Sequence, residues 1–398
     1  MRKYNHTWML AVVLAAGLLA GCQSQDYERI ELETSADIHL EDTGVSVEDS
    51  GILIEQEMTT AADQEPETQP AEPMEPTAPP TAPQPVELLF GGDVLLSSHV
   101  LNAYEKAGGI AGVLDEGYRQ AIGGADFFMV NEEFPFSDRG VQAADKEYTF
   151  RLPTEKVSMF QEMGIDGASL ANNHALDFGE DALLDSCTTL DGAGILHTGA
   201  GANLEAASQP IQIEKQGSRI AILGATRVIP EAGWAAGKNH AGMLAAYDAT
   251  HLLAKIKALR QTEDYVVVFV HWGIERDEQP QDYQRTLGQQ CIDAGADLVI
   301  GSHPHVLQGI EYYKGKPIVY SLGNFVFGST IPKTMLLQVT LDQGTAALRV
   351  VPGTSGAGYT RTLTDAVKLQ EFYQYLASIS FDVHYESDGR VVPAQAQP

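Results

Sequence analysis

The chain has 398 residues and carries 54 acidic and 25 basic side chains, a formal net charge of −29 at pH 7. Such an acidic chain is not expected to bind nucleic acid, because binding to phosphates needs a basic surface. The hydrophobic fraction of 44% is ample for a core, and the length fits one large domain or two to three ordinary ones.

The start of the chain has the pattern of a bacterial lipoprotein signal peptide. Arg2 and Lys3 form a short basic region, and residues 9–19 form an apolar run that is short for a membrane span. The run leads into the letters LAGC, which are similar to a lipobox, the motif whose Cys is lipidated and becomes the mature N-terminus. We therefore expect residues 1–22 to be a lipoprotein signal peptide and Cys22 to be the anchor in the lipid bilayer, on the extracytoplasmic face of the cell membrane. The alternative is an ordinary signal peptide in which this Cys is incidental.

Residues 23–85 are predicted to be a disordered tether. They contain sixteen acidic residues and one basic residue, Arg29, and eight prolines lie within residues 65–85. Such a segment cannot bury enough apolar surface to offset the entropy of ordering it, and its Pro-rich end is expected to be extended. Its simplest role is that of a spacer that holds a folded domain clear of a membrane.

The folded domain is predicted to begin near residue 86, with strands that alternate with helices. We expect strands at residues 86–90, 125–131, 167–170, 195–199, 219–224 and 265–270, and helices at residues 155–163, 180–192, 244–260 and 282–294. Two more apolar, β-branched runs lie within residues 296–327. This alternation predicts a largely parallel sheet with right-handed crossovers. A hairpin of residues 335–341 and 346–351 and a helix at residues 365–379 are predicted to complete the domain within residues 331–398, followed by a polar tail.

Two cysteines remain in the predicted folded domain. Cys187 and Cys291 each lie on the apolar stripe of a predicted helix, where a free Cys behaves as a small hydrophobic residue. A disulfide bond between them stays open, because spacing alone does not show pairing.

Three histidines follow two neighbouring predicted strands. His271 comes directly after the run that ends at residue 270, and His303 and His305 flank Pro304 in the loop after the next apolar run. Because chemistry in open α/β sheets lies at the carboxyl ends of the strands, we expect these imidazoles to lie close together. Imidazole is a ligand of zinc, iron, nickel and copper, and manganese accepts it beside oxygen ligands. The pattern predicts a metal site, although any one of these histidines could instead make a structural hydrogen bond.

Polar residues also follow three other predicted strands. Asp93 follows two glycines after the first strand, Glu133 follows the second strand, and the loop ANNHALD carries Asn173, His174 and Asp177. Each of these motifs alone is weak, because Gly-Asp and Asx-type loops are ordinary turn chemistry.

Taken together, the motifs resemble those of the poly-gamma-glutamate capsule biosynthesis family (CapA-type proteins), part of the metallo-dependent phosphatase superfold. They cover residues 86–330 in the family's order, and read GGDVLL, NEEFP, LANNHALDFG, HTGAG, HWGIE, GSHPHVLQ and SLGNFVFG. The resemblance implies an α/β fold, a four-layer α/β/β/α sandwich, with a metal centre along the strand ends. It also implies one or two divalent ions of manganese, iron or zinc.

The resemblance further implies a role for each matching residue. The implied metal ligands are Asp93, Glu133, Asn173, His271, His303 and His305. His174 would be the general acid that protonates a leaving group, and Asp177 would orient it. Glu275 and His197 would lie behind the ligands or face the substrate.

The sequence departs from typical metallophosphatases at three positions. They have Asp-x-His in the first loop, whereas here Leu95 replaces the histidine. They also have a bridging aspartate where this chain has Glu133, and both differences leave the number of ions open. Arg276 follows HWGIE where the capsule family commonly has an aromatic residue, which could alter contacts with the substrate.

The sequence therefore predicts a lipid-anchored, extracytoplasmic, metal-dependent hydrolase-like protein. It would act in the synthesis, export or trimming of an anionic cell-surface polymer such as poly-gamma-glutamate. Its partners would be that polymer or its precursor and the subunits of a membrane polymer synthase. Two alternatives remain: a non-catalytic accessory subunit that binds the polymer or the synthase, and a general phosphoesterase.

Overall fold

The structure, a computed structural model, describes residues 83–328 and 330–394. The predicted signal peptide, its Cys22 and nearly all of the predicted tether lie outside these residues. Within the described residues, no helix combines the length and apolar character that crossing a membrane requires.

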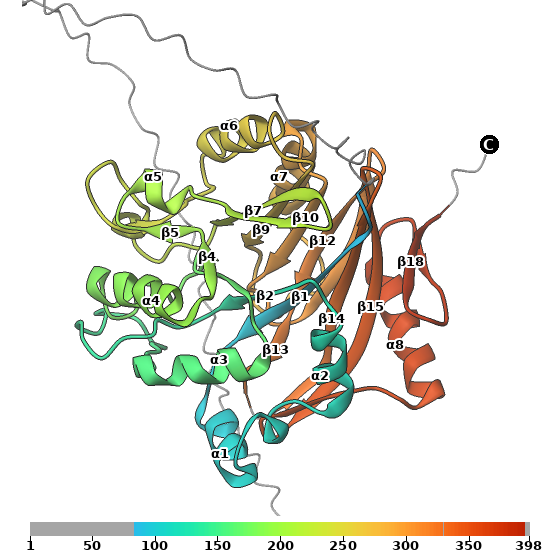
Figure 1. Ribbon diagram of the computed structural model, residues 1–398, viewed down its shortest axis with the longest axis horizontal. Coiled ribbons are helices and arrows are strands. Elements are labelled where there is room, and N and C mark those ends of the chain that lie inside the picture. The colour runs from blue at the N-terminus through green and yellow to red at the C-terminus, as the bar shows by residue number, and fades with distance from the viewer. Residues whose placement is uncertain (1–82, 329, 395–398) are drawn as a thin grey trace, which may run out of the picture. The chain divides into compact units, whose positions relative to one another are not determined.

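Two sheets form the centre of the folded part of the chain (Figure 1). In order across it, the larger sheet contains β17 (Val383–Tyr385), β18 (Arg390–Pro393), β15 (Thr345–Gly356), β14 (Thr330–Asp342), β1 (Val86–Val94), β2 (Phe127–Glu132), β3 (Gly167–Ser169) and β4 (Leu196–Thr198). Two further strands join this sheet, β13 (Asn324–Val326) beside β1 and β16 (Tyr359–Thr362) beside β15. The smaller sheet contains β11 (Leu307–Tyr313), β12 (Lys316–Leu322), β10 (Leu298–Ser302), β9 (Tyr265–His271), β7 (Ser218–Thr226) and β6 (Ile211–Lys215).

Helices cover the outer faces of both sheets. The larger sheet carries α1 (Ser98–Ala107), α2 (Glu116–Gly123), α3 (Val157–Met163) and α4 (Glu180–Ala193). The smaller sheet carries α5 (Leu204–Ala207), α6 (Thr250–Leu259) and α7 (Asp282–Ala294). A short pair of strands, β5 (Ala200–Gly201) and β8 (Gly242–Met243), lies outside the two sheets.

Three apolar clusters alternate with the sheets and divide the domain into four layers. The first outer cluster lies between the larger sheet and α1–α4, and includes Leu89 of β1 and Phe160 of α3. The inter-sheet cluster joins the two sheets, and includes Leu88 and Phe90 of β1 and Phe269 of β9. The second outer cluster joins the smaller sheet to its helices. This is the four-layer α/β/β/α sandwich, so the predicted fold class is confirmed.

Burial on both faces explains why the central strands read as unbroken apolar runs. In β9, Val267 and Phe269 belong to the inter-sheet cluster, whereas Val266, Val268 and Val270 belong to the second outer cluster. Successive side chains of a strand point to opposite faces, so a strand between two apolar layers needs an apolar residue at every position.

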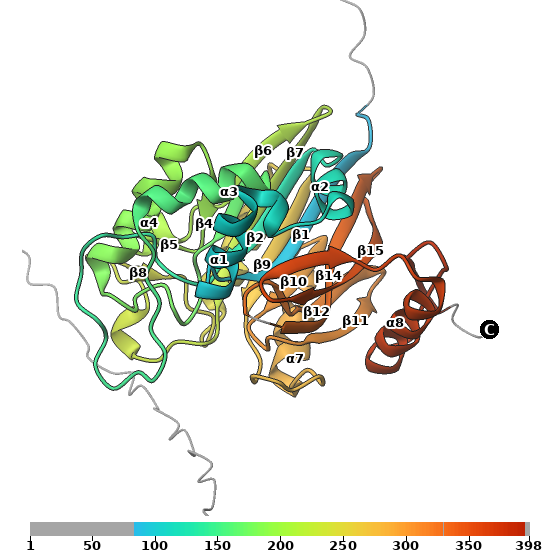
Figure 2. The ribbon, with the colours of Figure 1, turned by 90° about the horizontal axis from the view of Figure 1, so that it is seen from below.

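The last helix closes the inter-sheet cluster. In α8 (Ala366–Ile379), Phe372 and Leu376 are buried in that cluster, and the helix lies beside β11 (Figure 2). Asp365 caps the helix by accepting a hydrogen bond from the backbone N–H of Lys368 at 3.0 Å. This supplies one of the partners that the first N–H groups of a helix lack within the helix itself.

Close backbone contact joins the two sheets where the chain crosses from β12 to β13. The backbone N–H of Asp93 donates to the carbonyl of Gly323 at 2.8 Å. A Cβ atom at residue 92 would lie 1.8 Å from that same carbonyl oxygen, so Gly92 admits no larger residue without movement. Gly323 has a φ of 59°, in the left-handed region that favours glycine.

Some predicted boundaries are wrong. β1 does not end at residue 90 but continues to Val94, because Asp93 pairs with both β2 and β13. The helix predicted from residue 244 begins only at Thr250, because the backbone N–H groups of Leu244 and Ala246 donate to the carbonyls of Gly199 and Thr226 instead. The tail beyond α8 is not merely polar, since β17 and β18 extend the larger sheet.

Cys187 and Cys291 are both free. Cys187 packs against the first outer cluster, whereas Cys291 belongs to the second outer cluster. The two sheets therefore separate the thiols, and the disulfide bond that the sequence left open does not form.

Candidate metal centre

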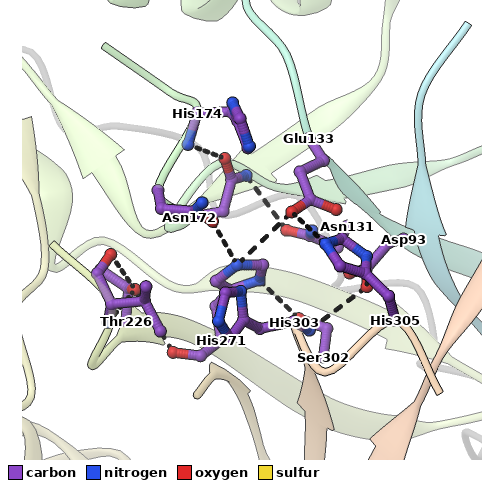
Figure 3. Close-up of polar contacts among 12 residues, drawn as sticks. Asp93, Asn131, Glu133, Asn172, His174, Thr226, His271, Ser302, His303 and His305 are labelled. Carbon is purple, nitrogen blue, oxygen red and sulfur yellow. Dashed lines mark hydrogen bonds and ion pairs between the residues drawn. The ribbon is translucent and has the colours of Figure 1, made fainter. Parts of the chain in front are cut away.

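The candidate centre lies where the carboxyl ends of parallel strands from both sheets meet (Figure 3). From the larger sheet come Asp93 near the end of β1, Glu133 directly after β2 and Asn173 after β3. From the smaller sheet come His271, the last residue of β9, and His303 and His305 after β10. All six residues predicted as ligands come together here, each in contact with at least one other of the six.

Glu133 lies at the middle of this group. Its Oε1 is 3.7 Å from His271 Nε2 and 3.8 Å from His305 Nε2, beyond hydrogen-bonding distance. Among the described residues, neither carboxylate oxygen of Glu133 has a hydrogen-bond partner, and the side chain is fully buried. Burial raises the pKa of Glu133 well above its ordinary value, and the nearby Asp93 adds to the rise. A buried carboxylate without partners is costly unless a cation neutralises it.

The residues around Glu133 fit a divalent metal ion. One ligand atom from each of Glu133, His303 and His305 lies within 4.8 Å of the other two. His303 Nδ1 is also buried without a hydrogen-bond partner in the described part of the chain. Mixed carboxylate and imidazole ligands suit manganese, iron or zinc. A single cation held by this group would give the carboxylate of Glu133 the partner that it lacks among these residues.

The backbone of this loop adopts a conformation that is uncommon outside glycine. The φ angles of His303 and His305 are 98° and 58°. Non-glycine residues at positive φ cost about 1–3 kcal/mol each and persist where the surroundings hold them. Here the backbone N–H of His303 donates to Asp93 Oδ2 at 3.3 Å, and the backbone N–H of Arg276 donates to the carbonyl of Pro304 at 2.8 Å.

Hydrogen bonds orient two of the imidazoles. His305 Nδ1 is 2.8 Å from Asn324 Oδ1, so that an Nδ1–H donor leaves Nε2 on the side of Glu133. His271 Nδ1 is 2.9 Å from Ser302 Oγ, and its Nε2 is 2.8 Å from Asn173 Oδ1. Nε2 and Oδ1 are both predicted ligand atoms and share a proton here, which a cation bound to both would displace.

The three histidines of the centre differ in their protonation. Burial, together with the neighbouring imidazoles, lowers the pKa of His271 well below its ordinary value and lowers the pKa of His303 to about 3. Burial acts in the same direction on His305, but Glu133 and Asp93 outweigh it and raise the pKa of His305 to about 10. Two of the imidazoles are therefore neutral and ready to bind a metal, whereas His305 carries a proton that a metal must displace.

Two asparagines that the sequence analysis did not single out hold the loops in place. Asn131 Nδ2 donates to Asp93 Oδ1 at 2.9 Å. Asn172 Nδ2 donates to Asn131 Oδ1 at 3.1 Å, and Asn172 Oδ1 accepts from the backbone N–H of His174 at 3.0 Å. The adjacent residues Asn172 and Asn173 therefore have different roles. Asn172 braces the loop, and Asn173 contacts His271. In the sequence, the signal for a role of Asn172 was its place in a pair of asparagines directly before a histidine.

The predicted catalytic pair forms, and it includes a third residue. His174 Nδ1 is 2.7 Å from Asp177 Oδ2, which also accepts from the backbone N–H of Phe150 at 2.6 Å. Lys146 forms an ion pair with Asp177 and lies 3.1 Å from His174 Nδ1, and it donates to the carbonyl of Asn173 at 2.5 Å. Burial lowers the pKa of Lys146, and Asp177 opposes that fall. Lys146 comes from the loop between the motifs NEEFP and LANNHALDFG and belongs to neither, so no spacing pattern pointed to it.

The remaining implied residues divide into two groups. Glu275 is exposed after β9 and lies close enough to Glu133 to raise the pKa of its carboxyl. By contrast, the nearest charged group to His197 is Asp191 of α4, with His197 Nε2 3.3 Å from Asp191 Oδ1, and no contact joins His197 to the six ligands among the described residues. Leu95 packs in the first outer cluster, so its position could not supply a ligand without turning the chain.

Fold and site together describe a four-layer α/β/β/α protein with a carboxylate and histidine centre at its strand ends. Residues 87–329 match the family described as bacterial capsule synthesis protein PGA_cap, and the chain belongs to this family.

Named relatives agree with this assignment. The chain is 36% identical over 269 residues to the PGA biosynthesis protein CapA of Bacillus subtilis, a match that covers 66% of this chain and 70% of that protein. It is 33% identical over 299 residues to the capsule biosynthesis protein CapA of Bacillus anthracis, covering 72% and 71%. A probable polyglutamine synthesis accessory protein of Mycobacterium tuberculosis is 32% identical over 211 residues, covering 50% and 55%.

Solved structures give weaker likenesses. A phosphatase of Mycoplasma pneumoniae matches with 11% identity and a TM-score of 0.41, covering 74% of this chain and 99% of that one. The NAD nucleotidase of Haemophilus influenzae matches with 11% identity and a TM-score of 0.42, covering 75% and 57%. The order of layers described above, rather than these values, carries the assignment of the fold.

Glu133→Gln is expected to remove tight binding of Mn²⁺ or Zn²⁺ while leaving the fold intact, because Gln keeps the shape of the side chain and loses its charge. A metal that binds only the folded protein stabilises it, by about 2.7 kcal/mol at a concentration of 100 times Kd. A chelator should therefore lower the melting temperature of the wild type and leave that of Glu133→Gln unchanged, measured by calorimetry with metal content determined on the same samples. Glu263→Gln, at a buried carboxylate outside the centre, should respond as the wild type does. A Glu133→Gln protein that holds metal at the wild-type level would contradict the assignment.

Metal binding is expected to release protons and to strengthen as pH rises. The folded pKa of His305, about 10, lies above its ordinary value of 6.5. Its contribution to the stability of the metal-free protein is therefore complete below pH 6.5 and is lost as pH rises through 10. Titration calorimetry with Zn²⁺ in two buffers of different ionisation enthalpy measures the release, which should shrink in His305→Gln. Equal heats in both buffers for the wild type would refute this account.

Proposed function

We propose that this protein is a metal-dependent hydrolase that acts on a γ-linked glutamate polymer during the synthesis, export or trimming of a capsule. The observation that carries the proposal is the buried carboxylate of Glu133, which has no hydrogen-bond partner in the described part of the chain and lies between two histidines, beside a His174–Asp177 pair. The substrate class comes from the family, whose relatives are named for PGA biosynthesis and capsule biosynthesis. The type of reaction, hydrolysis, is inferred from the candidate metal ligands and the His174–Asp177 pair.

The residues that would hold the metal are the six gathered at the strand ends, Asp93, Glu133, Asn173, His271, His303 and His305. When bound, a divalent cation would supply Lewis-acid polarisation of the scissile carbonyl and lower the pKa of a bound water. Asn131 keeps Asp93 in place for this role, and Asn324 does the same for His305.

His174 would move the proton that breaking an amide bond requires. Water adds to the carbonyl carbon, the C–N bond breaks, and the departing nitrogen must receive a proton. An Nδ1–H donor to Asp177 at 2.7 Å fixes the tautomer of His174 and leaves Nε2 to carry that proton. Lys146 holds Asp177 from its other side, so the pair keeps one geometry.

A second candidate is a non-catalytic accessory subunit that binds polymer beside a synthase. The printed name of the mycobacterial relative, a synthesis accessory protein, favours it, and so does the loss of the usual first-loop histidine at Leu95. Metal bound in stoichiometric amount with turnover supports the hydrolase, and tight polymer binding without turnover supports the accessory subunit. Turnover confined to phosphoesters would instead support a general phosphoesterase.

His174→Asn is expected to keep the fold and the metal while lowering kcat by about 10²- to 10⁴-fold, because the leaving nitrogen loses its proton donor. The loss should be smaller for a γ-glutamyl anilide, whose leaving group needs less protonation, than for a γ-linked glutamate oligomer. His303→Ala should lose activity on both substrates equally, because it damages the centre itself. Kinetics on the substrate pair, with metal content measured, tests this. Wild-type kcat in metal-loaded His174→Asn would remove the general-acid role, and no turnover by the wild type on any substrate would leave the accessory subunit.

We also propose that the protein is lipid-anchored at Cys22 on the extracytoplasmic face of the membrane, with residues 23–85 as the tether. The letters LAGC and the acidic, Pro-rich composition that follows support this. Cys22→Ala is expected to move the protein from the membrane fraction to the soluble extracytoplasmic fraction, measured by fractionation and immunoblotting. Ser24→Ala, two residues further on, serves as the control and should stay in the membrane. Membrane association of Cys22→Ala equal to that of the wild type would refute the anchor.

A further inference from the structure

Arg227 lies at the same edge of the smaller sheet as the candidate metal centre. It follows Thr226, the last residue of β7, which pairs with His271 (Figure 3 shows these two side by side). The backbone N–H of Arg227 donates to the carbonyl of His271 at 2.8 Å. The position of Arg227 is thus tied directly to a predicted metal ligand.

Two tyrosine rings hold the guanidinium of Arg227. Its central carbon lies 4.1 Å from the ring centre of Tyr283 and 5.7 Å from that of Tyr247. The hydroxyl of Tyr283 accepts a hydrogen bond from the backbone N–H of Gly273 at 2.9 Å, so this ring is itself fixed to the segment that follows His271. Stacking on aromatic rings orients a guanidinium without using its N–H donors.

Those donors have no acceptor within residues 83–328 and 330–394. Among the described residues, no hydrogen bond or ion pair involves the side chain of Arg227, although it is half-buried. By contrast, three arginines elsewhere in the domain pair with carboxylates, namely Arg139 with Asp185, Arg260 with Asp297 and Arg285 with Glu311. In a chain with a net charge of −29, a guanidinium without a carboxylate partner is available for an external anion, which its planar fork can bind through two N–H groups.

Exposed apolar surface lies beside this guanidinium. Tyr247, one of the two tyrosines against the guanidinium, is 58% exposed. Its exposed surface is large enough to pack against a short stretch of methylene groups. A ligand that joins a carboxylate to such a stretch would use the free guanidinium and the exposed apolar surface together.

We propose that Arg227 binds the α-carboxylate of a γ-linked glutamyl residue, while Tyr247 packs against the methylene groups of the same residue. This inference rests on the proposed function and names a binding site for the polymer beside the centre that would cut it. A glutamyl residue linked through its side chain leaves its α-carboxylate free and carries two methylene groups, which matches both features of the site.

The test compares two probes on the full chain loaded with Mn²⁺. One probe is a γ-linked glutamate oligomer, and the other is the same oligomer with its α-carboxylates converted to amides. Titration calorimetry should show that the wild type binds the carboxylate oligomer about tenfold or more tightly than the amide, because charge-assisted bidentate hydrogen bonds are lost with the amide. Arg227→Gln should bind both oligomers with the same weak affinity, and Arg227→Lys should recover part of the difference.

Controls separate this effect from a change in net charge or folding. Arg390→Gln removes the same charge at an exposed arginine that is paired with Asp388, and it should bind as the wild type does. Tyr247→Ala alters a mostly exposed side chain, so it should fold normally and weaken binding of both oligomers by a similar factor.

Three outcomes would contradict the role of Arg227, the proposed function or both. Arg227→Gln with full discrimination between the two oligomers overturns the role of Arg227 and leaves the proposed function standing. A wild type that binds neither oligomer overturns both proposals. Competition by inorganic phosphate that depends on Arg227, with no discrimination between the oligomers, assigns the arginine to a phosphoryl group and overturns the carboxylate site.

Discussion

The arrangement of the centre depends on one costly feature, a fully buried carboxylate at Glu133 that accepts no hydrogen bond from any residue the structure describes. A lone charge in such surroundings is unfavourable by several kcal/mol or more. The chain answers this with imidazoles on two sides and holds His305 protonated through Glu133 and Asp93. The same geometry suits a divalent cation better than a proton, since a cation can bind the carboxylate and the imidazoles of His303 and His305 at once. The asparagines, the strained histidine loop and the Lys146 contact can all be understood as supports for this group.

Two cationic side chains near the centre, Lys146 and Arg227, both contact aromatic rings in an otherwise acidic chain. Lys146 pairs with Asp177 and lies 5.3 Å from the ring centre of Trp234, and Arg227 lies against Tyr283. Trp234 and Tyr247 both belong to the segment between β7 and α6, so one stretch of chain supplies an aromatic ring to each cation. For Arg227 the rings hold the cation without neutralising it, whereas Asp177 offsets the charge of Lys146. A site built for an anionic ligand gains from this difference.

The strands and the histidine site after two of them could be predicted from local patterns, whereas the four-layer order and the full set of ligands came from the resemblance to the capsule family. Strands buried on both faces leave unbroken apolar runs, and the polar residues directly after such runs are the residues that the two sheets bring together. Lys146, Asn131 and Asn172 were missed because their roles depend on contacts with residues far from them in sequence. The start of α6 was misplaced because the backbone before Thr250 bonds to other strands, which overrides its local helical preference. The short strands β17 and β18 are stabilised because β18 pairs with β15 and β17 pairs with β18. Their own residues carry no strong strand pattern, so they were not predicted.

The contact of Gly92 with Gly323 has a consequence for how this protein can change over time. The two halves of the centre belong to different sheets, and backbone atoms hold the sheets together at this point, with 2.8 Å between the nitrogen of Asp93 and the oxygen of Gly323. Side chains of the inter-sheet cluster begin directly beside this contact, with Leu322 before Gly323 and Phe90 two residues before Gly92. A side chain at residue 92 would collide with the carbonyl of Gly323 and push the two halves of the centre apart, so descendants that keep the centre must also keep this glycine.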